Sequence, residues 1–174
     1  MRPYDIRCNG IVIRPPRVTD GPKIMTMVRE SAVLDVNSDY AYLLMCTHFS
    51  MTSAFAQDGD ENVGFVIAYL PPDQPEILFV WQICIRSGYR GLGLGHLLIE
   101  SLLHRPGCRG VRFVEATVNP SNLASQRLFQ SLAKKYSTEC QTSKFFPKDL
   151  FGSGNHEEEL LFRVGPLRCN DQKE

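Results

Sequence analysis

The feature that most constrains the fold is a glycine-rich turn between an apolar strand and an apolar helix. Residues 77–85 form an almost wholly apolar run, and residues 94–104 repeat apolar side chains at helical spacing. Between them, residues 90–95 read Arg-Gly-Leu-Gly-Leu-Gly, and a second apolar run, 111–118, follows the helix. A strand, a helix and another strand in this order predict a parallel crossover in the second half of the chain.

Weaker patterns place the remaining elements around this crossover. They predict a strand at 11–14, a helix capped by Thr19 or Asp20, a helix capped by Ser38, strands at 51–56 and 63–70, a helix opened by 119–121 and reaching 134, and a closing strand at 158–164. Antiparallel strands therefore come first and one strand closes the sheet. This order predicts an α+β (mixed α/β) fold in a single domain spanning residues 1–174.

The composition excludes several classes of protein. Among 174 residues, 19 Lys and Arg balance 19 Asp and Glu, so no basic excess favours nucleic acid or an anionic membrane. Residues 1–5 lack the apolar core of a signal peptide, and the chain has no apolar run of about 18 residues. We therefore expect a cytoplasmic protein with no nucleic-acid or membrane partner.

The cysteines favour reduced thiols. They are scattered and include no Cys-x-x-Cys pair: Cys8, Cys46, Cys84, Cys108, Cys140 and Cys169. Without a secretion signal, free thiols are favoured over disulfides, and the spacing does not suit a zinc site. We expect no bound metal.

The glycine turn suits an anion. The first N–H groups of a helix have no partner within the helix and carry partial positive charge, so they favour a phosphate. Glycine lets the backbone approach phosphate oxygens without a Cβ in the way, and Arg90 adds a permanent charge. The alternative is a tight connection that binds nothing. A Walker loop is excluded because no Gly-Lys-Ser/Thr follows, and the late position of the turn disfavours a Rossmann fold.

Residues 90–95 resemble the R/Q-x-x-G-x-G/A motif of the GNAT superfamily of N-acetyltransferases, and Asn122-x-x-Ser125-x-x-Leu128-Phe129 resembles its second motif. The resemblance implies the GNAT fold, a central twisted and mostly antiparallel sheet with a parallel pair at the acetyl-CoA cleft, flanked by helices. It implies acetyl-CoA as cosubstrate. The expected cofactor-binding residues are Ile83, Ile85, Arg90, Gly91, Gly93, Gly95, Asn122 and, as an early helix residue, His96. Phe129 departs from the family pattern. At this position the family often has a tyrosine that protonates the leaving thiolate.

Four separate blocks resemble the diaminobutyrate acetyltransferase family of the ectoine pathway, at residues 34–46, 79–82, 115–122 and 156–163. This closer resemblance implies acetylation of the 4-amino (γ) group of L-2,4-diaminobutyrate, giving γ-N-acetyl-diaminobutyrate. It also implies a homodimer. We expect direct transfer in a ternary complex, since no histidine lies near Cys84 in sequence to activate it as a nucleophile.

The first residues expected to bind the acceptor are Asp35, Tyr40 and Trp81. Asp35 and Tyr40 lie in the segment between helices that usually walls the acceptor pocket in this superfamily. We predict that Asp35 pairs with a substrate ammonium and that Tyr40 orients it; the alternative for Asp35 is helix capping or turn chemistry. Trp81, the sole tryptophan, closes the pocket or makes a cation–π contact in this interpretation, and core packing is an equal competitor.

Glu115 interrupts the apolar run 111–118, where a charge is seldom buried without a partner. We predict that it binds an acceptor ammonium or accepts a proton, and the alternative is a structural salt bridge. Thr117, two residues later, is expected to hydrogen-bond the substrate or its water.

His156 opens the last block, followed by three glutamates. Strand alternation places Glu157 and Glu159 on one face and His156 and Glu158 on the other. We predict that the face bearing His156 and Glu158 looks into the acceptor site, where either residue relays a proton.

Two rival functions stay open at this point. One is a GNAT enzyme that acetylates another diamine, a polyamine or a protein amino terminus. The other is a non-catalytic acyl-CoA sensor, which Phe129 favours and the polar acceptor-side residues disfavour.

Overall fold

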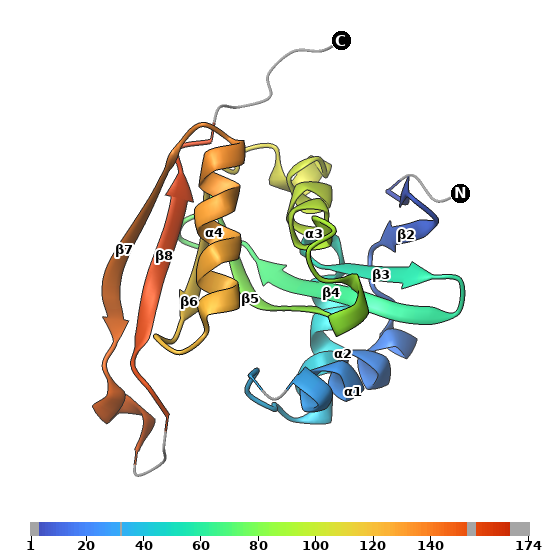
Figure 1. Cartoon of the computed structure of the whole chain (residues 1–174), viewed down its shortest axis with the longest axis horizontal. Coiled ribbons are helices and arrows are strands. Elements are labelled where there is room, and N and C mark those ends of the chain that lie inside the picture. The colour runs from blue at the N-terminus through green and yellow to red at the C-terminus, as the bar shows by residue number, and fades with distance from the viewer. Residues whose placement is uncertain (1–3, 32, 153–155, 168–174) are drawn as a thin grey trace. The chain divides into compact units, whose positions relative to one another are not determined.

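The computed structural model describes residues 4–31, 33–152 and 156–167. Within them lie a sheet of eight strands and four α-helices (Figure 1). The strands are β1 (Ile6–Cys8), β2 (Ile11–Arg14), β3 (Ala54–Asp58), β4 (Glu61–Tyr69), β5 (Ile77–Ile85), β6 (Phe113–Val118), β7 (Glu139–Phe146) and β8 (Glu159–Gly165). The helices are α1 (Gly21–Ser31), α2 (Asp39–His48), α3 (Leu94–Leu103) and α4 (Leu123–Lys135). The strand order is β1-β2-β3-β4-β5-β6-β8-β7.

The pairing of the strands confirms the predicted mixed sheet. Strands β5 and β6 form a parallel pair, and α3 lies in the connection between them. The pairs β1–β2, β2–β3, β3–β4, β6–β8 and β7–β8 are antiparallel. A parallel pair needs a crossover of a dozen or so residues, which explains why a helix follows the glycine turn.

The chain divides into two compact units, and β5 contributes to both. Unit 1 comprises Met1–Tyr69 and Trp81–Arg109, and unit 2 comprises Leu70–Val80 and Gly110–Glu174. Unit 1 therefore holds β1 to β4, α1 to α3 and the second part of β5. Unit 2 holds the first part of β5, strands β6 to β8 and α4. The expectation of one domain over residues 1–174 stays a prediction.

In unit 1, α1 and α2 pack on one face of β3 and β4. One apolar cluster joins them: Ile24, Met27, Val28, Tyr42, Cys46, Phe55, Phe65 and Ile67. The three residues from α1 stand at i, i+3 and i+4, so one apolar face of this helix packs against the sheet. Ser38 begins α2 as predicted, because its hydroxyl oxygen accepts a hydrogen bond from the Ala41 N–H at 3.3 Å.

Helix α3 packs on the opposite face of β4. Since Phe65 faces the cluster, its neighbour Gly64 points the other way. A Cβ added at Gly64 would lie 3.4 Å from Leu98 of α3 and 2.9 Å from Ile85 at the end of β5. The missing side chain therefore lets α3 and the end of β5 lie close to β4.

In unit 2, α4 packs on β7 and β8. Its Phe129 is only 1% exposed, and the ring centroid lies 6.4 Å from that of Phe162 on β8. Asn122 begins the helix, because its side-chain oxygen accepts a hydrogen bond from the Ser125 N–H at 3.1 Å. The second GNAT-like motif thus starts at a helix cap and continues into the core.

Some elements differ from the sequence prediction. The sequence patterns do not predict β7, because its side chains are mostly exposed and show no apolar period. They also miss the short β1. The strand predicted at 51–56 begins only at Ala54, since residues 50–52 form a 3₁₀ turn.

Two chemical expectations concern the whole chain. Free thiols occur at Cys8, Cys46, Cys84, Cys108 and Cys140, and the thiol prediction for Cys169 lies outside the described residues. None of the described helices is long and apolar enough to cross a membrane.

A buried ion pair joins β2 to the 3₁₀ turn just before α1. Arg14 is 7% exposed and Asp20 is 2% exposed. Arg14 donates to both carboxylate oxygens of Asp20, at 2.6 Å from Nη1 and 3.0 Å from Nη2, and to Gln57 Oε1 at 2.7 Å. The Arg17 N–H also donates to Asp20 Oδ2 at 2.7 Å. Burial alone would raise the pKa of Asp20, but the hydrogen bonds from Arg14 and Arg17 hold this pKa below its usual value.

Asp20→Asn should lower the free energy of unfolding by about 3 kcal/mol, because Arg14 is left buried without its counter-charge. Urea denaturation measures this change. Lys23→Ala is the matched control: Lys23 Nζ lies 3.9 Å from Asp20 Oδ1 with its side chain 44% exposed, and its loss should cost about 0.5 kcal/mol or less. Equal effects of the two substitutions would contradict a special stabilising role for the buried Arg14–Asp20 pair.

The pH dependence of the Asp20→Asn effect has a definite sign. Because the folded pKa of Asp20 lies below its usual value of 3.8, its stabilisation is present above that value and is lost as the pH falls through the folded pKa. The difference between wild type and variant should therefore shrink in urea titrations made at progressively lower pH.

Candidate active site

The turn between β5 and α3 offers main-chain groups to an anion. Gly91 and Gly93 both have a φ of +76°, a left-handed conformation that residues with a Cβ rarely adopt. Apart from the glycine itself and its chain neighbours, no residue has a heavy atom within 4 Å of the Cβ position at either glycine. Gly93 is the N-cap of α3, and the Leu97 N–H donates to its carbonyl at 3.1 Å. The turn is therefore open to a ligand at the positive end of a helix.

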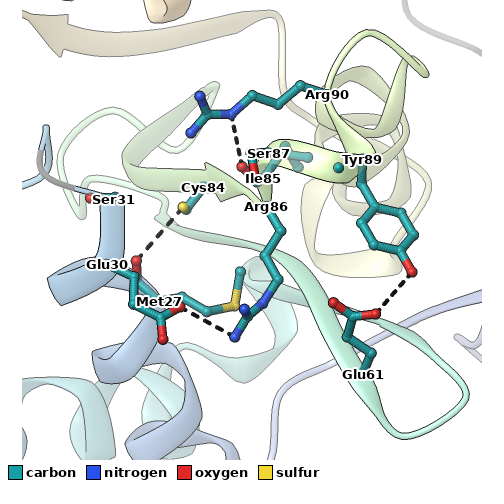
Figure 2. Close-up of a pocket in the computed structure, with 11 residues that line it drawn as sticks. Met27, Glu30, Ser31, Glu61, Cys84, Ile85, Arg86, Ser87, Tyr89 and Arg90 are labelled. Carbon is teal, nitrogen blue, oxygen red and sulfur yellow. Dashed lines mark hydrogen bonds and ion pairs between the residues drawn. The ribbon is translucent and has the colours of Figure 1, made fainter.

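A cavity of about 230 Å³ lies beside this turn in unit 1 (Figure 2). It lies between the end of α1, the start of β4 and the end of β5. Its charged walls are Glu30, Glu61, Arg86 and Arg90. Arg86 Nη2 lies 3.3 Å from Glu30 Oε2, and Arg90 Nε donates to the Ile85 carbonyl at 3.1 Å. Arg90 thus lies against the end of β5, whereas Arg86 extends from that end toward Glu30 of α1 (Figure 2).

Tyr89 ties the turn to the β3–β4 hairpin. Its hydroxyl lies 3.1 Å from Asp58 Oδ2 and 3.2 Å from Glu61 Oε2. Burial and these two carboxylates raise the pKa of Tyr89 to about 12, so the hydroxyl stays protonated. Its role is to fix the turn rather than to accept a proton.

Cys84 lines the same cavity, with Sγ 4.0 Å from the Met27 carbonyl oxygen. Burial raises the pKa of the Cys84 thiol, although Arg90 and Arg86 lower it. A protonated thiol is a poor nucleophile. The environment therefore favours direct transfer over an acyl-enzyme.

The parallel register of β5 and β6 is short. It runs from Ile77–Phe113 to Phe79–Glu115, whereas β5 continues to Ile85. After Phe79, the N–H and C=O groups on the β6 side of β5 are not paired with β6 in that register. Ile83 and Ile85 lie in this later part of the strand. Such an edge suits an extended ligand that carries amide groups.

The predicted acceptor residues of unit 1 lie on three parts of the chain: the α1–α2 connection, α2 and β5. Asp35 is exposed in this connection, and Ser38 rather than Asp35 caps α2. Tyr40 lies in the first turn of α2 with 68% of its surface exposed. Trp81 is half-buried against the apolar cluster, and its ring stacks on Tyr42 with centroids 6.3 Å apart. The packing alternative for Trp81 thus has structural support.

In unit 2, Glu115 on β6 is paired with Arg163 on β8. The two residues are direct partners across the strands, and Arg163 Nη1 donates to Glu115 Oε1 at 2.7 Å. The guanidinium also lies 4.0 Å from the centroid of the Phe113 ring. Burial raises the pKa of Glu115, although Arg163 lowers it. This geometry supports the salt bridge given above as the alternative role of Glu115.

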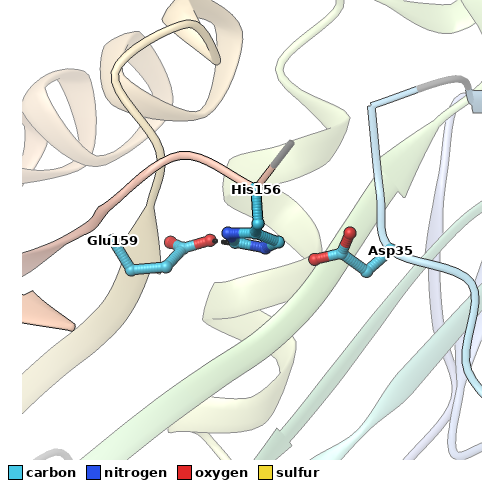
Figure 3. Close-up of side chains that lie close together, drawn as sticks. All are labelled: Asp35, His156 and Glu159. Atoms are coloured by element: carbon cyan, nitrogen blue, oxygen red, sulfur yellow. Dashed lines mark ion pairs between the residues drawn. The ribbon is translucent and has the colours of Figure 1, made fainter. Parts of the chain in front are cut away.

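The predicted alternation of residues 156–159 is wrong. Strand β8 begins only at Glu159, so a two-residue period does not extend to the three residues before it. His156 Nε2 lies 3.8 Å from Glu159 Oε1, a residue predicted on the opposite face (Figure 3). The Glu157 carboxylate instead accepts a hydrogen bond from the Ser121 N–H at 3.0 Å. Glu158 is half-buried just before the strand.

The imidazole of His156 is held in one orientation. Its Nδ1 lies 2.6 Å from the Glu157 carbonyl oxygen, and the ring stacks on Phe151 with centroids 3.9 Å apart. Because a carbonyl oxygen only accepts, Nδ1 carries the proton in the neutral ring. The lone pair is then on Nε2, which lies 3.8 Å from the Glu159 carboxylate. This arrangement suits a proton acceptor.

The remaining predicted residues lie at element ends or in strands. Gly95 and His96 are in the first turn of α3. Asn122 caps α4, and Thr117 is half-buried on β6 opposite Leu161.

Two polar residues contribute contacts that the sequence patterns do not single out. Gln82 on β5 is 5% exposed and donates to the Asp35 carbonyl, and Arg163 holds Glu115. A glutamine within an apolar run is a detectable signal for the first. The second depends on the register of β6 and β8, which local patterns do not give.

Comparisons with known proteins agree with this architecture. Residues 24–133 match the model of the Acetyltransferase (GNAT) family. The chain is 47% identical to L-2,4-diaminobutyric acid acetyltransferase of Shouchella clausii, over 91% of this chain and 88% of the relative. It is also 47% identical to the protein of that name from Halalkalibacterium halodurans, over 90% of this chain and 82% of the relative.

A solved structure matches nearly the whole chain. It is diaminobutyrate acetyltransferase EctA from Paenibacillus lautus in complex with its substrate L-2,4-diaminobutyric acid and coenzyme A. The TM-score is 0.87 at 37% sequence identity, covering 94% of this chain and 98% of that chain.

Gly93→Ala should lower the free energy of unfolding by about 1–2 kcal/mol, because a Cβ is strained at this left-handed φ. Gly88→Ala is the matched control in the same turn, since its φ is not positive and its Cβ position has no neighbour within 4 Å. That control should change stability by about 0.5 kcal/mol or less. Thermal or urea unfolding of both variants checks the difference, and equal losses would contradict it.

Proposed function

This chain belongs to the acetyltransferase (GNAT) family, and we propose that it transfers the acetyl group of acetyl-CoA to the 4-amino group of L-2,4-diaminobutyrate. The product is γ-N-acetyl-diaminobutyrate, a precursor in ectoine biosynthesis. The observation that carries the proposal is similarity over about nine-tenths of the chain to relatives of that name. The match to a structure that holds both diaminobutyric acid and coenzyme A supports it.

Acetyl-CoA fits the turn before α3. Open, left-handed Gly91 and Gly93 and the amides of the first helical turn, which include Gly95 and His96, hold the pyrophosphate. Arg90 adds charge beside them. The main chain of β5 at Ile83 and Ile85 pairs with the pantetheine arm, and Asn122 contacts it from the start of α4.

The acceptor must be held and made neutral. An aliphatic amine with a pKa of about 10.4 is almost wholly protonated at pH 7.5, and removing its proton there costs about 4 kcal/mol. Asp35 binds a substrate ammonium, and Tyr40 orients the substrate. Trp81 closes the pocket, and Thr117 hydrogen-bonds the substrate or its water. The neutral amine then attacks the thioester carbonyl directly.

Among the predicted catalytic residues, His156 fits the role of proton acceptor best. Its Nε2 is the unprotonated nitrogen of the neutral ring and has the Glu159 carboxylate beside it. Glu115 is a weaker candidate because the Arg163 guanidinium occupies one of its oxygens. A catalytic role for Glu158 stays a prediction.

We also propose that the protein is a cytoplasmic homodimer. The dimer follows from the resemblance to the diaminobutyrate acetyltransferase family, and the free thiols of the described residues suit a reducing compartment. Light scattering would give twice the chain mass of 19.7 kDa; a monomer mass would exclude the dimer.

Purified protein should release CoA from acetyl-CoA with L-2,4-diaminobutyrate much faster than with ornithine, lysine, putrescine or spermidine. NMR of the product should place the acetyl group on the 4-amino nitrogen. Turnover only with another amine would keep the family and discard this substrate. Tight acetyl-CoA binding without any turnover would instead favour an acyl-CoA sensor.

His156→Gln should lower kcat about 100-fold, because it removes the proton acceptor, and should weaken the pH dependence of kcat. Glu115→Gln should leave kcat within about threefold, while lowering the free energy of unfolding by about 1–3 kcal/mol through the damaged Arg163 pair. Steady-state kinetics and urea denaturation of both variants separate the two roles. If kcat instead falls strongly in Glu115→Gln and stays nearly unchanged in His156→Gln, Glu115 is the catalytic residue.

A further inference from the structure

Gln82 is a buried polar residue in an apolar strand of unit 1. It stands within the β5 run Ile-Leu-Phe-Val-Trp-Gln-Ile-Cys-Ile and is 5% exposed. A primary amide buried among apolar side chains is unfavourable unless its hydrogen bonds are made. The contacts of this amide therefore indicate what it does.

The amide of Gln82 reaches the segment between α1 and α2. Its Nε2 donates to the Asp35 carbonyl oxygen at 2.8 Å. Because this carbonyl can only accept, the contact fixes which end of the amide is nitrogen. Asn37 Nδ2 donates to the same carbonyl at 3.2 Å. The backbone at Asp35 thus receives hydrogen bonds from a buried strand and from its own segment.

A second buried residue holds the same segment two positions later. The Asn37 N–H donates to the hydroxyl oxygen of Tyr42 at 3.2 Å. Tyr42 is 0% exposed and stacks on Trp81, the residue before Gln82. Adjacent residues of β5 therefore support Asp35 and Asn37, one directly and the other through Tyr42.

The segment itself has little apolar surface to hold it in place. Val33 is 59% exposed and Val36 is 56% exposed, and Leu34 is its partly buried apolar anchor. A segment with few buried apolar contacts opens easily unless polar contacts hold it. The hydrogen bond from Gln82 is one such contact, and it acts at the residue that carries the predicted substrate carboxylate.

We propose that Gln82 is a positioning residue for the acceptor: its amide N–H fixes the main chain of Asp35, and thereby sets the direction of the Asp35 carboxylate toward the diamine. The inference rests on the proposed function and adds a specificity-determining residue to it. Gln82 Oε1 is buried and has no hydrogen-bond partner among the residues that the structure describes. The nitrogen is thus the amide atom that contacts Asp35. A substitution that keeps an oxygen and removes the nitrogen therefore tests the contribution of the nitrogen alone.

Gln82→Met keeps the length of the side chain and removes both polar atoms, and Gln82→Glu keeps an oxygen but removes the donor. Both variants should raise KM for L-2,4-diaminobutyrate about tenfold, as expected for the loss of one buried hydrogen bond. KM for acetyl-CoA should change by less than about twofold, because the turn before α3 is untouched. If Gln82→Glu has the wild-type KM for the diamine, the donor is not needed, and any effect of Gln82→Met comes from the loss of Oε1. That result would overturn the proposal.

A double-mutant cycle tests whether Gln82 acts through Asp35. On an Asp35→Ala background, Gln82→Met should raise KM for the diamine by less than about twofold, because the group that it positions is gone. A full tenfold increase on that background would show that Gln82 acts independently of Asp35, and the proposal would fail.

Amide hydrogen exchange tests the same contact without any substrate. Gln82→Met should speed exchange in residues 33–38 about tenfold. Gln57→Met is the matched control, since Gln57 is a hydrogen-bonded glutamine of the same unit that holds Arg14 instead; it should leave exchange in residues 33–38 unchanged. Unchanged exchange in Gln82→Met would overturn the proposal. A wild-type protein that does not acetylate diaminobutyrate would refute the proposed function, an outcome that the exchange measurement distinguishes because it needs no substrate.

Discussion

Strand β5 is the constraint on which the rest of the structure depends. Its first residues pair in parallel with β6, so the chain must cross over between the two strands, and α3 lies in that connection. Trp81 and Gln82 are consecutive, yet they contact Tyr42 and Asp35, both from the α1–α2 region. A regular strand would point neighbouring side chains to opposite faces. Long side chains at consecutive positions of β5 therefore both reach the α1–α2 region, beyond the last residue of β5 that pairs with β6 in parallel.

The parts of the fold that could be predicted from the sequence are those with local causes. The strand at 77–85 and the Ser38 cap agree with the structure, and α3 ends one residue before the predicted end at 104. Each depends on residues close together in sequence, such as an apolar run or a cap within one helical turn. Strand β7 has no such signal. It is exposed along most of its length, and its main-chain pairing with β8 makes it a strand.

The candidate site likewise combines features with local causes, which the sequence predicts, and contacts between distant residues, which it does not. The glycine turn is visible in the sequence because its backbone conformation requires glycine at Gly91 and Gly93. The partners of Gln82 and Glu115 are not, because the hydrogen bonds span 47 and 48 positions of the chain. The surroundings of His156 do not follow from the sequence for another reason. Residues 156–158 precede β8, which begins at Glu159, so the two-residue period of a strand does not set the directions of their side chains.

Phe129 bears on how the reaction manages its protons. It is buried against Phe162, so position 129 is a core position here and supplies no hydroxyl to the leaving thiolate. A thiol with a pKa of about 8.5 loses only about 1.4 kcal/mol if it departs unprotonated at pH 7.5, whereas freeing the amine of its proton costs about 4 kcal/mol. The missing proton donor is therefore the smaller deficit. In the proposed reaction the larger cost therefore lies at the acceptor amine, and a group that takes its proton should influence the rate more than a donor to the thiolate would.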